Sequence, residues 1–291
     1  MLPASSALTS LPLQLALGLA LSSLIGWVAY QRRSLSRSGV LGAILTGTLI
    51  FGFGGWVGGL LLIAFFVSSS LLSRFKERDE RKRLAAEQFE KGGERDLGQA
   101  LANGGAATGL AVLSWVVALS DPKAGEALFA ALVGALATVN ADTWATELGV
   151  LSKAAPRLIT RLSQCVSPGT SGGVTTLGTL AAGGGALFIG ASHSAFALVF
   201  APERLGFALG VLPLATLGGL LGSLFDSVLG ATVQAMYYSD RRQKETEKPV
   251  ERDGTPNRWI RGWRWLNNDW VNFLASLVGA ATTGVSWALL A

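Results

Sequence analysis

Four acidic side chains interrupt stretches of this sequence that are otherwise almost entirely apolar. Ionisable groups inside apolar segments are costly in a membrane and usually serve a function. A group of acids gathered in one place would repel one another unless a cation lay between them. Mg²⁺ carrying nucleotide phosphates is the natural cation, because it prefers carboxylates together with phosphate oxygens. The candidate catalytic acids are Asp142, Glu147, Asp226 and Asp269, and we expect Asp142 and Asp226 to be the metal ligands.

Three asparagines accompany these acids at the ends of apolar segments. Asn103 lies near the start of one segment, and Asn268 and Asn272 flank Asp269. Positions four residues apart share one face of a helix, so Asn268 and Asn272 can act together. We expect the amides to hold phosphate or ribose. Two other interpretations of the acids remain open: ion translocation, and structural pairing with a Lys or Arg that would have to fold in from a loop.

A glycine-rich loop, residues 167–173, supplies groups that suit a phosphate. Exposed backbone N–H groups of glycines can cradle anions, and a following helix N-terminus favours negative charge. Lys153, Arg157 and Arg161 precede the loop and would neutralise a transferring phosphoryl group. The candidate phosphate- and nucleotide-binding residues are Asn103, Lys153, Arg157, Gly169, Thr170, Gly172, Gly173, Asn268 and Asn272.

The composition excludes several other kinds of site. The chain has one cysteine and one histidine, which rules out a disulfide framework, a Cys-rich metal site and a histidine cluster. Only 15% of its 291 residues are charged, and half are apolar, whereas soluble domains carry about 25% charged residues. The net charge of +5 does not call for a nucleic acid partner, because the placement of the cations has another explanation.

That explanation is membrane topology. A helix needs about 20 apolar residues to cross a bilayer core. We predict an all-α, polytopic helical bundle, a single transmembrane domain over residues 1–291 with about eight spans; seven spans and a re-entrant second segment are the alternative. The predicted spans are 11–30, 39–54, 57–73, 99–119, 126–150, 174–200, 204–236 and 270–290. We expect residues 76–96 to form a solvated helix and residues 240–258 to be a flexible loop.

Eight alternating spans bring all the highly charged segments to one side. Of the 24 Lys and Arg residues, only Lys123 and Arg204 lie on the other side. Cytoplasmic loops carry an excess of Lys and Arg, so we expect cytoplasmic loops at 74–98, 151–173 and 237–268 and both termini outside. The four acids and the three asparagines then all lie in the cytoplasmic halves of their helices.

Four motifs in order resemble a family of integral membrane proteins that includes plastid phytyl-phosphate kinase and animal transmembrane protein 19. The motifs are NADTWATELG at 140–149, PGTSGGV at 168–174, DSVLGATVQ at 226–234 and NNDWVNF at 267–273. The resemblance covers roughly residues 35–290 and suggests a distant relation to polyprenol kinases and CTP-dependent lipid cytidylyltransferases. It carries over the four acids and the glycines and threonine of the glycine-rich loop as the functional positions.

The resemblance implies a membrane-embedded enzyme that transfers a phosphoryl group from CTP or ATP, with Mg²⁺, to a prenyl monophosphate such as phytyl or geranylgeranyl phosphate. A phosphate monoester is already largely anionic at pH 7, since its second pKa is about 6, so the acceptor needs no strong base. The alternatives are a cytidylyltransferase that forms a CDP-lipid and an ion-coupled transporter. The expected partners are a lipid-like prenyl phosphate, a nucleotide and the membrane, with a homo-oligomer left open.

Overall fold

The protein is a bundle of long apolar helices. The computed structural model describes residues 11–90, 93–251 and 253–291. Within that part of the chain, seven helices are long and apolar enough to cross a membrane, which confirms the predicted all-α polytopic architecture. The helices are α1 Leu11–Gln31, α2 Arg37–Arg74, α3 Glu80–Ala86, α4 Leu97–Ala118, α5 Pro122–Gly149, α6 Thr176–Phe200, α7 Leu205–Thr232 and α8 Asn268–Leu290, with a 3₁₀ turn, η2 Pro202–Arg204, before α7.

Helix α2 is folded back on itself at Gly55. This glycine has φ of 64° and ψ of −163°, outside the helical region, a conformation that suits a residue without a Cβ atom. A Cβ on Gly58 would lie 3.3 Å from the Ile50 carbonyl oxygen. In a straight helix, two residues that are eight positions apart would not lie this close. Arg74 at the far end donates to Ser34 near the start of α2. The two limbs, 37–54 and 56–74, therefore correspond to the predicted spans 39–54 and 57–73.

Helix α5 forms the centre of the bundle. Every residue from Ala130 to Ala141 is buried, which is expected for a helix surrounded by neighbours rather than by lipid. Glycines and small side chains allow this close packing: a Cβ on Gly185 of α6 would lie 3.0 Å from the Asn140 carbonyl oxygen. Asn140 itself donates to the Gly185 carbonyl at 2.8 Å. The position that follows this buried run is Asp142.

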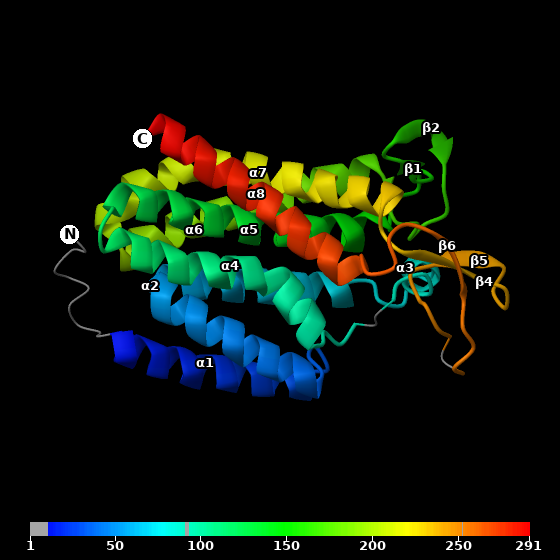
Figure 1. The fold of residues 1–291 in the computed structure, drawn as a ribbon, viewed down its shortest axis with the longest axis horizontal. Coiled ribbons are helices and arrows are strands. Elements are labelled where there is room, and N and C mark those ends of the chain that lie inside the picture. Colours follow the sequence, from blue (N-terminus) through cyan, green and yellow to red (C-terminus); the bar gives the residue numbers. More distant parts are fainter. Residues whose placement is uncertain (1–10, 91–92, 252) are drawn as a thin grey trace.

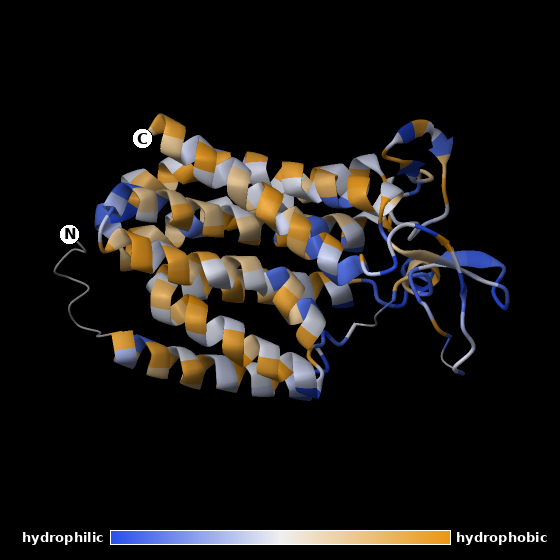
Figure 2. Cartoon of the chain, in the orientation of Figure 1, coloured by the Kyte–Doolittle hydropathy of each residue, from blue (hydrophilic) through white to orange (hydrophobic). Residues whose placement is uncertain are grey.

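The bundle has two different ends (Figure 1). The C-terminus and the Leu11 end of α1 lie at one end, and the strands, α3 and the long loops lie at the other. Figure 2 shows that the loop end is rich in hydrophilic residues, while the helices between the two ends are largely hydrophobic. The charged segments thus gather at one end, as the alternating spans predict.

Two small antiparallel sheets stand on the loop end, and the sequence pattern does not predict them. One has the order β2-β1-β3, with β1 Arg157–Leu158, β2 Arg161–Cys165 and β3 Gly173–Val174. The other has the order β5-β4-β6, with β4 Met236–Ser239, β5 Lys244–Thr246 and β6 Arg258–Arg261.

The second sheet corrects two predictions. Residues 240–258 are not one flexible loop, because they contribute β5 and the first residue of β6. The predicted span 204–236 is too long, because α7 ends at Thr232. The chain turns there to pair with the segment before α8: Ala235 N–H donates to the Leu266 carbonyl at 2.8 Å, and Trp263 N–H donates to the Val233 carbonyl at 2.8 Å.

Candidate functional site

A cavity of about 290 Å³ lies at the loop end of the bundle, and we call it the first cavity. Helices α2, α4, α5, α6, α7 and α8 contribute to its wall, together with the loops after α3, α5 and α7. Eleven of the predicted site residues line it: Asn103, Asp142, Glu147, Gly169, Thr170, Gly172, Gly173, Asp226, Asn268, Asp269 and Asn272. Segments separated by more than 160 residues in sequence thus meet at one place.

Asp142 and Asp226 line this cavity from the central helix α5 and from α7. Each lies about two turns before the end of its helix, at Gly149 and at Thr232 respectively. The charges of the two carboxylates repel each other. Oδ2 of Asp226 is buried without a hydrogen-bond partner in the described part of the chain, and a buried polar atom in that state is costly unless a ligand satisfies it. This pair therefore fits a cation.

The surroundings of the pair limit the kind of cation site. Among the described residues, no group of three or more His, Cys, Asp or Glu side chains is arranged to hold a metal ion. A dedicated all-protein cage is therefore not present in that part of the chain. Mg²⁺ commonly binds through one or two carboxylates and completes its shell with water and substrate phosphates, which is the arrangement that Asp142 and Asp226 can offer.

Glu147 has a protein partner of its own. Its Oε2 lies 2.7 Å from Nζ of Lys82 in α3, and its Oε1 accepts a hydrogen bond of 2.6 Å from Ser73 Oγ. Lys82 also donates to the Leu72 carbonyl at 2.8 Å, and its side chain is only 8% exposed. The interpretation that a loop cation folds in to pair with an acid thus describes Glu147, whereas Asp226 has no such partner among the residues that the structure describes.

The glycine-rich loop is held in a conformation that needs its glycines. Gly169 and Gly172 have φ of 87° and 80°, in the left-handed region that residues with a Cβ rarely adopt. The loop is also pressed between two helices: a Cβ on Gly172 would lie 2.5 Å from Ala231 Cβ of α7, and a Cβ on Gly169 would lie 2.8 Å from Ala85 Cα of α3. Helix α3 therefore covers the loop and fixes it against the cavity.

The cations at the cavity are not those that the sequence suggested. Lys153 and Arg157 are exposed and do not line it. Arg157 instead donates to the Leu162 carbonyl of the neighbouring strand β2 at 2.7 Å. The cavity is lined instead by Arg95, directly before α4. The sequence held a signal for this residue: Arg95, Gln99 and Asn103 are spaced by four, and all three line the cavity.

Glu247 also lines the cavity and was not identified from the sequence. It accepts hydrogen bonds from Gln234 Nε2 at 3.0 Å and from Glu90 N–H at 3.2 Å. Burial raises the pKa of Glu247 to about 7, although these hydrogen bonds act in the opposite direction. No motif surrounds Glu247 in the sequence, so only the fold brings it to the site.

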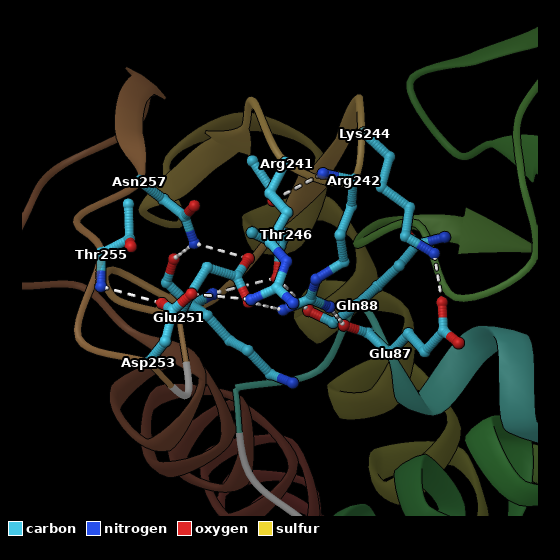
Figure 3. A network of polar contacts seen from close by, with 12 residues as sticks. Glu87, Gln88, Arg241, Arg242, Lys244, Thr246, Glu251, Asp253, Thr255 and Asn257 are labelled. Carbon is cyan, nitrogen blue, oxygen red and sulfur yellow. Dashed lines mark hydrogen bonds and ion pairs between the residues drawn. The ribbon is translucent and has the colours of Figure 1, made fainter.

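A polar network fixes the loop that carries Glu247 (Figure 3). The segment after α3 runs beside β5: Thr246 Oγ1 donates to the Gln88 carbonyl at 2.9 Å, and Lys244 forms an ion pair with Glu87. Arg242 forms an ion pair with Glu251, and this contact lowers the pKa of Glu251 to about 2. The loop and the segment after α3 are thus joined into one cap over the cavity.

The wall of the cavity carries more negative than positive groups. Among the described residues that line it, six are acids and Arg95 is the one base; Lys82 neutralises Glu147 from behind the wall. A phosphate would be repelled by this wall unless a divalent cation accompanied it. The combination of carboxylates, amides and a glycine-rich loop therefore suits a metal–phosphate complex better than a free anion.

Comparison with known proteins places the chain among integral membrane proteins. The family described as integral membrane protein DUF92 matches residues 20–280. The chain is 38% identical over 289 residues to Protein PGR of Arabidopsis thaliana, covering 96% of this chain and 98% of the plant protein. It is 29% identical over 249 residues to an uncharacterized membrane protein of Methanocaldococcus jannaschii, covering 86% and 84% of the two chains.

A third relative is an uncharacterized membrane protein of Synechocystis, 27% identical over 246 residues, with 82% of this chain and 77% of the relative covered. No solved structure matches the chain. The family match spans all four motifs that carried the resemblance in the sequence. The chain belongs to the DUF92 family of integral membrane proteins.

Proposed function

We propose that this protein is a prenyl-phosphate kinase that transfers a phosphoryl group from CTP or ATP to an isoprenoid monophosphate. The observation that carries the proposal is the buried Oδ2 of Asp226, which lies beside Asp142 and the glycine-rich loop and has no hydrogen-bond partner within 11–90, 93–251 and 253–291. Asp142 and Asp226 would hold Mg²⁺, which supplies charge neutralisation for the phosphates. Thr170 and the glycines of the loop would orient the phosphates, and the asparagines at the cavity would hold phosphate or ribose.

The reaction asks little of the protein beyond positioning and charge neutralisation. An oxygen of the acceptor monophosphate attacks the γ-phosphorus of the nucleotide. The bond from that phosphorus to the β–γ bridging oxygen breaks, and the nucleoside diphosphate leaves with the electron pair. Because the acceptor oxygen is already anionic, no proton has to be removed. The absence of a histidine from the wall of the first cavity is therefore compatible with this chemistry.

The experiment uses the full chain in lipid nanodiscs with labelled CTP or ATP, Mg²⁺ and phytyl or geranylgeranyl phosphate. We expect a prenyl diphosphate and a nucleoside diphosphate as products. Asp142→Asn and Asp226→Asn are expected to lower turnover at least about 100-fold, the scale of removing one preorganised electrostatic group from an active site. Glu203→Gln, an exposed acid at the opposite end, is the matched control and should keep full turnover.

The products separate this proposal from its competitors. Release of pyrophosphate and formation of a CDP-lipid would identify a cytidylyltransferase instead. No turnover with either nucleotide and several chain lengths, combined with substrate flux into proteoliposomes that Asp142→Asn abolishes, would identify a transporter. Transporter sites usually lie near the middle of the bilayer, whereas the first cavity lies at the loop end of the bundle, which favours the enzyme.

We further propose that the loop end faces the cytoplasm, because almost all the Lys and Arg residues gather there. The chain carries its own reporter: its single cysteine, Cys165, is exposed in β2 at that end. A membrane-impermeant maleimide should label Cys165 in inverted vesicles and leave it unlabelled in intact cells. Labelling of intact cells would reverse the orientation.

A further inference from the structure

A second cavity, of about 90 Å³, adjoins the first on the side of the bundle formed by α1, both limbs of α2 and the start of α4. Its wall is mostly apolar, with Leu21, Ile25, Leu62, Ile63, Phe65 and Phe66 among the lining residues. Three residues line both cavities: Arg95, Gln99 and Asn103. A polar space and an apolar space thus meet along one face of α4.

Arg95 is held firmly at this junction. Its N–H donates to the Ser34 carbonyl at 3.1 Å, and its carbonyl accepts from Ser36 N–H at 3.0 Å. The guanidinium lies 5.5 Å from the centre of the Phe65 ring and 5.7 Å from that of Phe66, within the range of a cation–π contact. The aromatic rings of the second cavity therefore orient the charged end of Arg95.

One nitrogen of the Arg95 guanidinium lacks a protein partner among the described residues. Its Nη1 is buried and has no hydrogen-bond partner in the described part of the chain. Burial lowers the pKa of Arg95 to about 10, and the charge of Glu147 opposes this shift to a smaller extent, so the side chain still carries its charge at neutral pH. A buried cation with a free N–H is costly without an anionic partner, and a phosphate suits the fork of donors that arginine presents.

We infer that the second cavity binds the hydrocarbon segment next to the phosphate of a single-chain lipid phosphate, with Arg95 on the phosphate at the junction. The identity of the lipid as an isoprenoid monophosphate rests on the proposed function. The cavity is small and adjoins lipid-exposed helices, so it takes the part of one chain nearest the head, and the rest of the chain extends into the bilayer. This arrangement brings the acceptor phosphate into the first cavity beside Asn103.

The test is photo-crosslinking without nucleotide, which does not depend on turnover. The probe is geranylgeranyl phosphate with a diazirine in the isoprene unit next to the phosphate, added to the full chain in nanodiscs. After irradiation and digestion, mass spectrometry should place the adducts on α1, α2 and α4 residues that line the second cavity. Unlabelled geranylgeranyl phosphate should compete. Adducts on α6 and α7, or spread evenly over lipid-facing residues, would overturn the inference.

Two substitutions sharpen the test. Ala43→Phe fills the second cavity from α2 and should lower labelling at least ten-fold. The smaller Ala43→Leu should lower labelling less, and it keeps the test usable if Ala43→Phe does not fold. Ala20→Phe is the matched control, because Ala20 is exposed on α1 outside the cavity, and it should label like the wild type. Labelling of a folded Ala43→Phe at the wild-type level would also overturn the inference.

The phosphate contact is tested with the corresponding alcohol probe, which lacks the phosphate. Arg95→Met should weaken labelling by the phosphate probe at least ten-fold and leave labelling by the alcohol probe within two-fold. An equal loss with both probes would assign Arg95 a structural role and refute the phosphate contact. If the adducts map to the second cavity while no diphosphate forms in the kinase assay, the proposed function fails and the lipid site stands. If diphosphate forms while the adducts map elsewhere, the proposed function stands and the lipid site fails.

Discussion

The ion pair between Lys82 and Glu147 leads to a sharp prediction, because it links a surface helix to the wall of the first cavity. Helix α3 has only seven residues, and isolated helices of that length do not persist in water. Its order must come from docking, and Lys82 provides the most buried polar contact of that docking. Replacing Lys82 by Met keeps most of the side-chain stem and removes the charge, which leaves Glu147 without its cation.

The size of the effect follows from burial and contacts. Removing one partner of a buried ion pair costs about 3–5 kcal/mol. Glu147 is 23% exposed and keeps its hydrogen bond from Ser73, so water can reach it and the cost belongs at the lower end, about 3 kcal/mol. Since about 1.4 kcal/mol is a tenfold change in an equilibrium constant, the open form of α3 should become about 100-fold more populated.

Hydrogen exchange in nanodiscs measures this opening directly. Protection of residues 80–86 should fall by about 100-fold in Lys82→Met, or to the unprotected limit. Lys123→Met, an exposed lysine at the opposite end, should leave it unchanged. The double variant Lys82→Met/Glu147→Gln should recover most of the protection, because it removes both charges together.

The same variants separate a positioning role of Glu147 from a catalytic one. Since α3 covers the glycine-rich loop at Gly169, loss of docking should lower turnover in Lys82→Met. If Glu147 only positions α3, the double variant regains turnover. If Glu147 acts in catalysis, the double variant stays inactive although α3 is protected. Exchange in Lys82→Met within about three-fold of the wild type would refute the reasoning from burial, because it would correspond to less than about 1 kcal/mol.

Three further predictions concern the loop, the cap and the metal. Gly172→Ala should abolish turnover and lower the melting temperature, because its φ is 80° and the added Cβ meets Ala231; Gly183→Ala in α6, where a Cβ meets nothing within 4 Å, should do neither. Burial raises the pKa of Glu247 to about 7 from 4.5, so the folded state binds the carboxyl proton of Glu247 more tightly than the unfolded state does. The resulting stabilisation of the folded state is fully present below pH 4.5 and is lost as the pH rises through 7. The amide hydrogens of residues 236–251 should therefore be less protected from exchange at pH 8 than at pH 5.5, after correction for intrinsic rates. Glu247→Gln should remove the difference, and protection that grows with pH would contradict the raised pKa of Glu247. Removal of divalent ions should abolish turnover and Mg²⁺ should restore it, whereas turnover in excess chelator would exclude a metal at Asp142 and Asp226.

The sequence anticipated those features that depend on local composition. Apolar length and the short breaks between runs located the spans, including the fold of α2 at Gly55. The cost of a charge in an apolar helix was enough to single out Asp142 and Asp226. Helical spacing was enough to place Asn268 and Asn272 on one face, and both line the first cavity.

The tertiary structure decided which polar residues of the long loops reach the site. Lys82, Arg95 and Glu247 lie at the cavity or behind its wall, while the predicted cations Lys153 and Arg157 are exposed and do not line it. Charged loops carry no hydrophobic periodicity, so nothing in their sequence states which helix end they cover. Spans are determined by the transfer of one segment into lipid, a property of that segment alone. Partners across a cavity are determined by contacts between distant segments, which exist only once the bundle has formed.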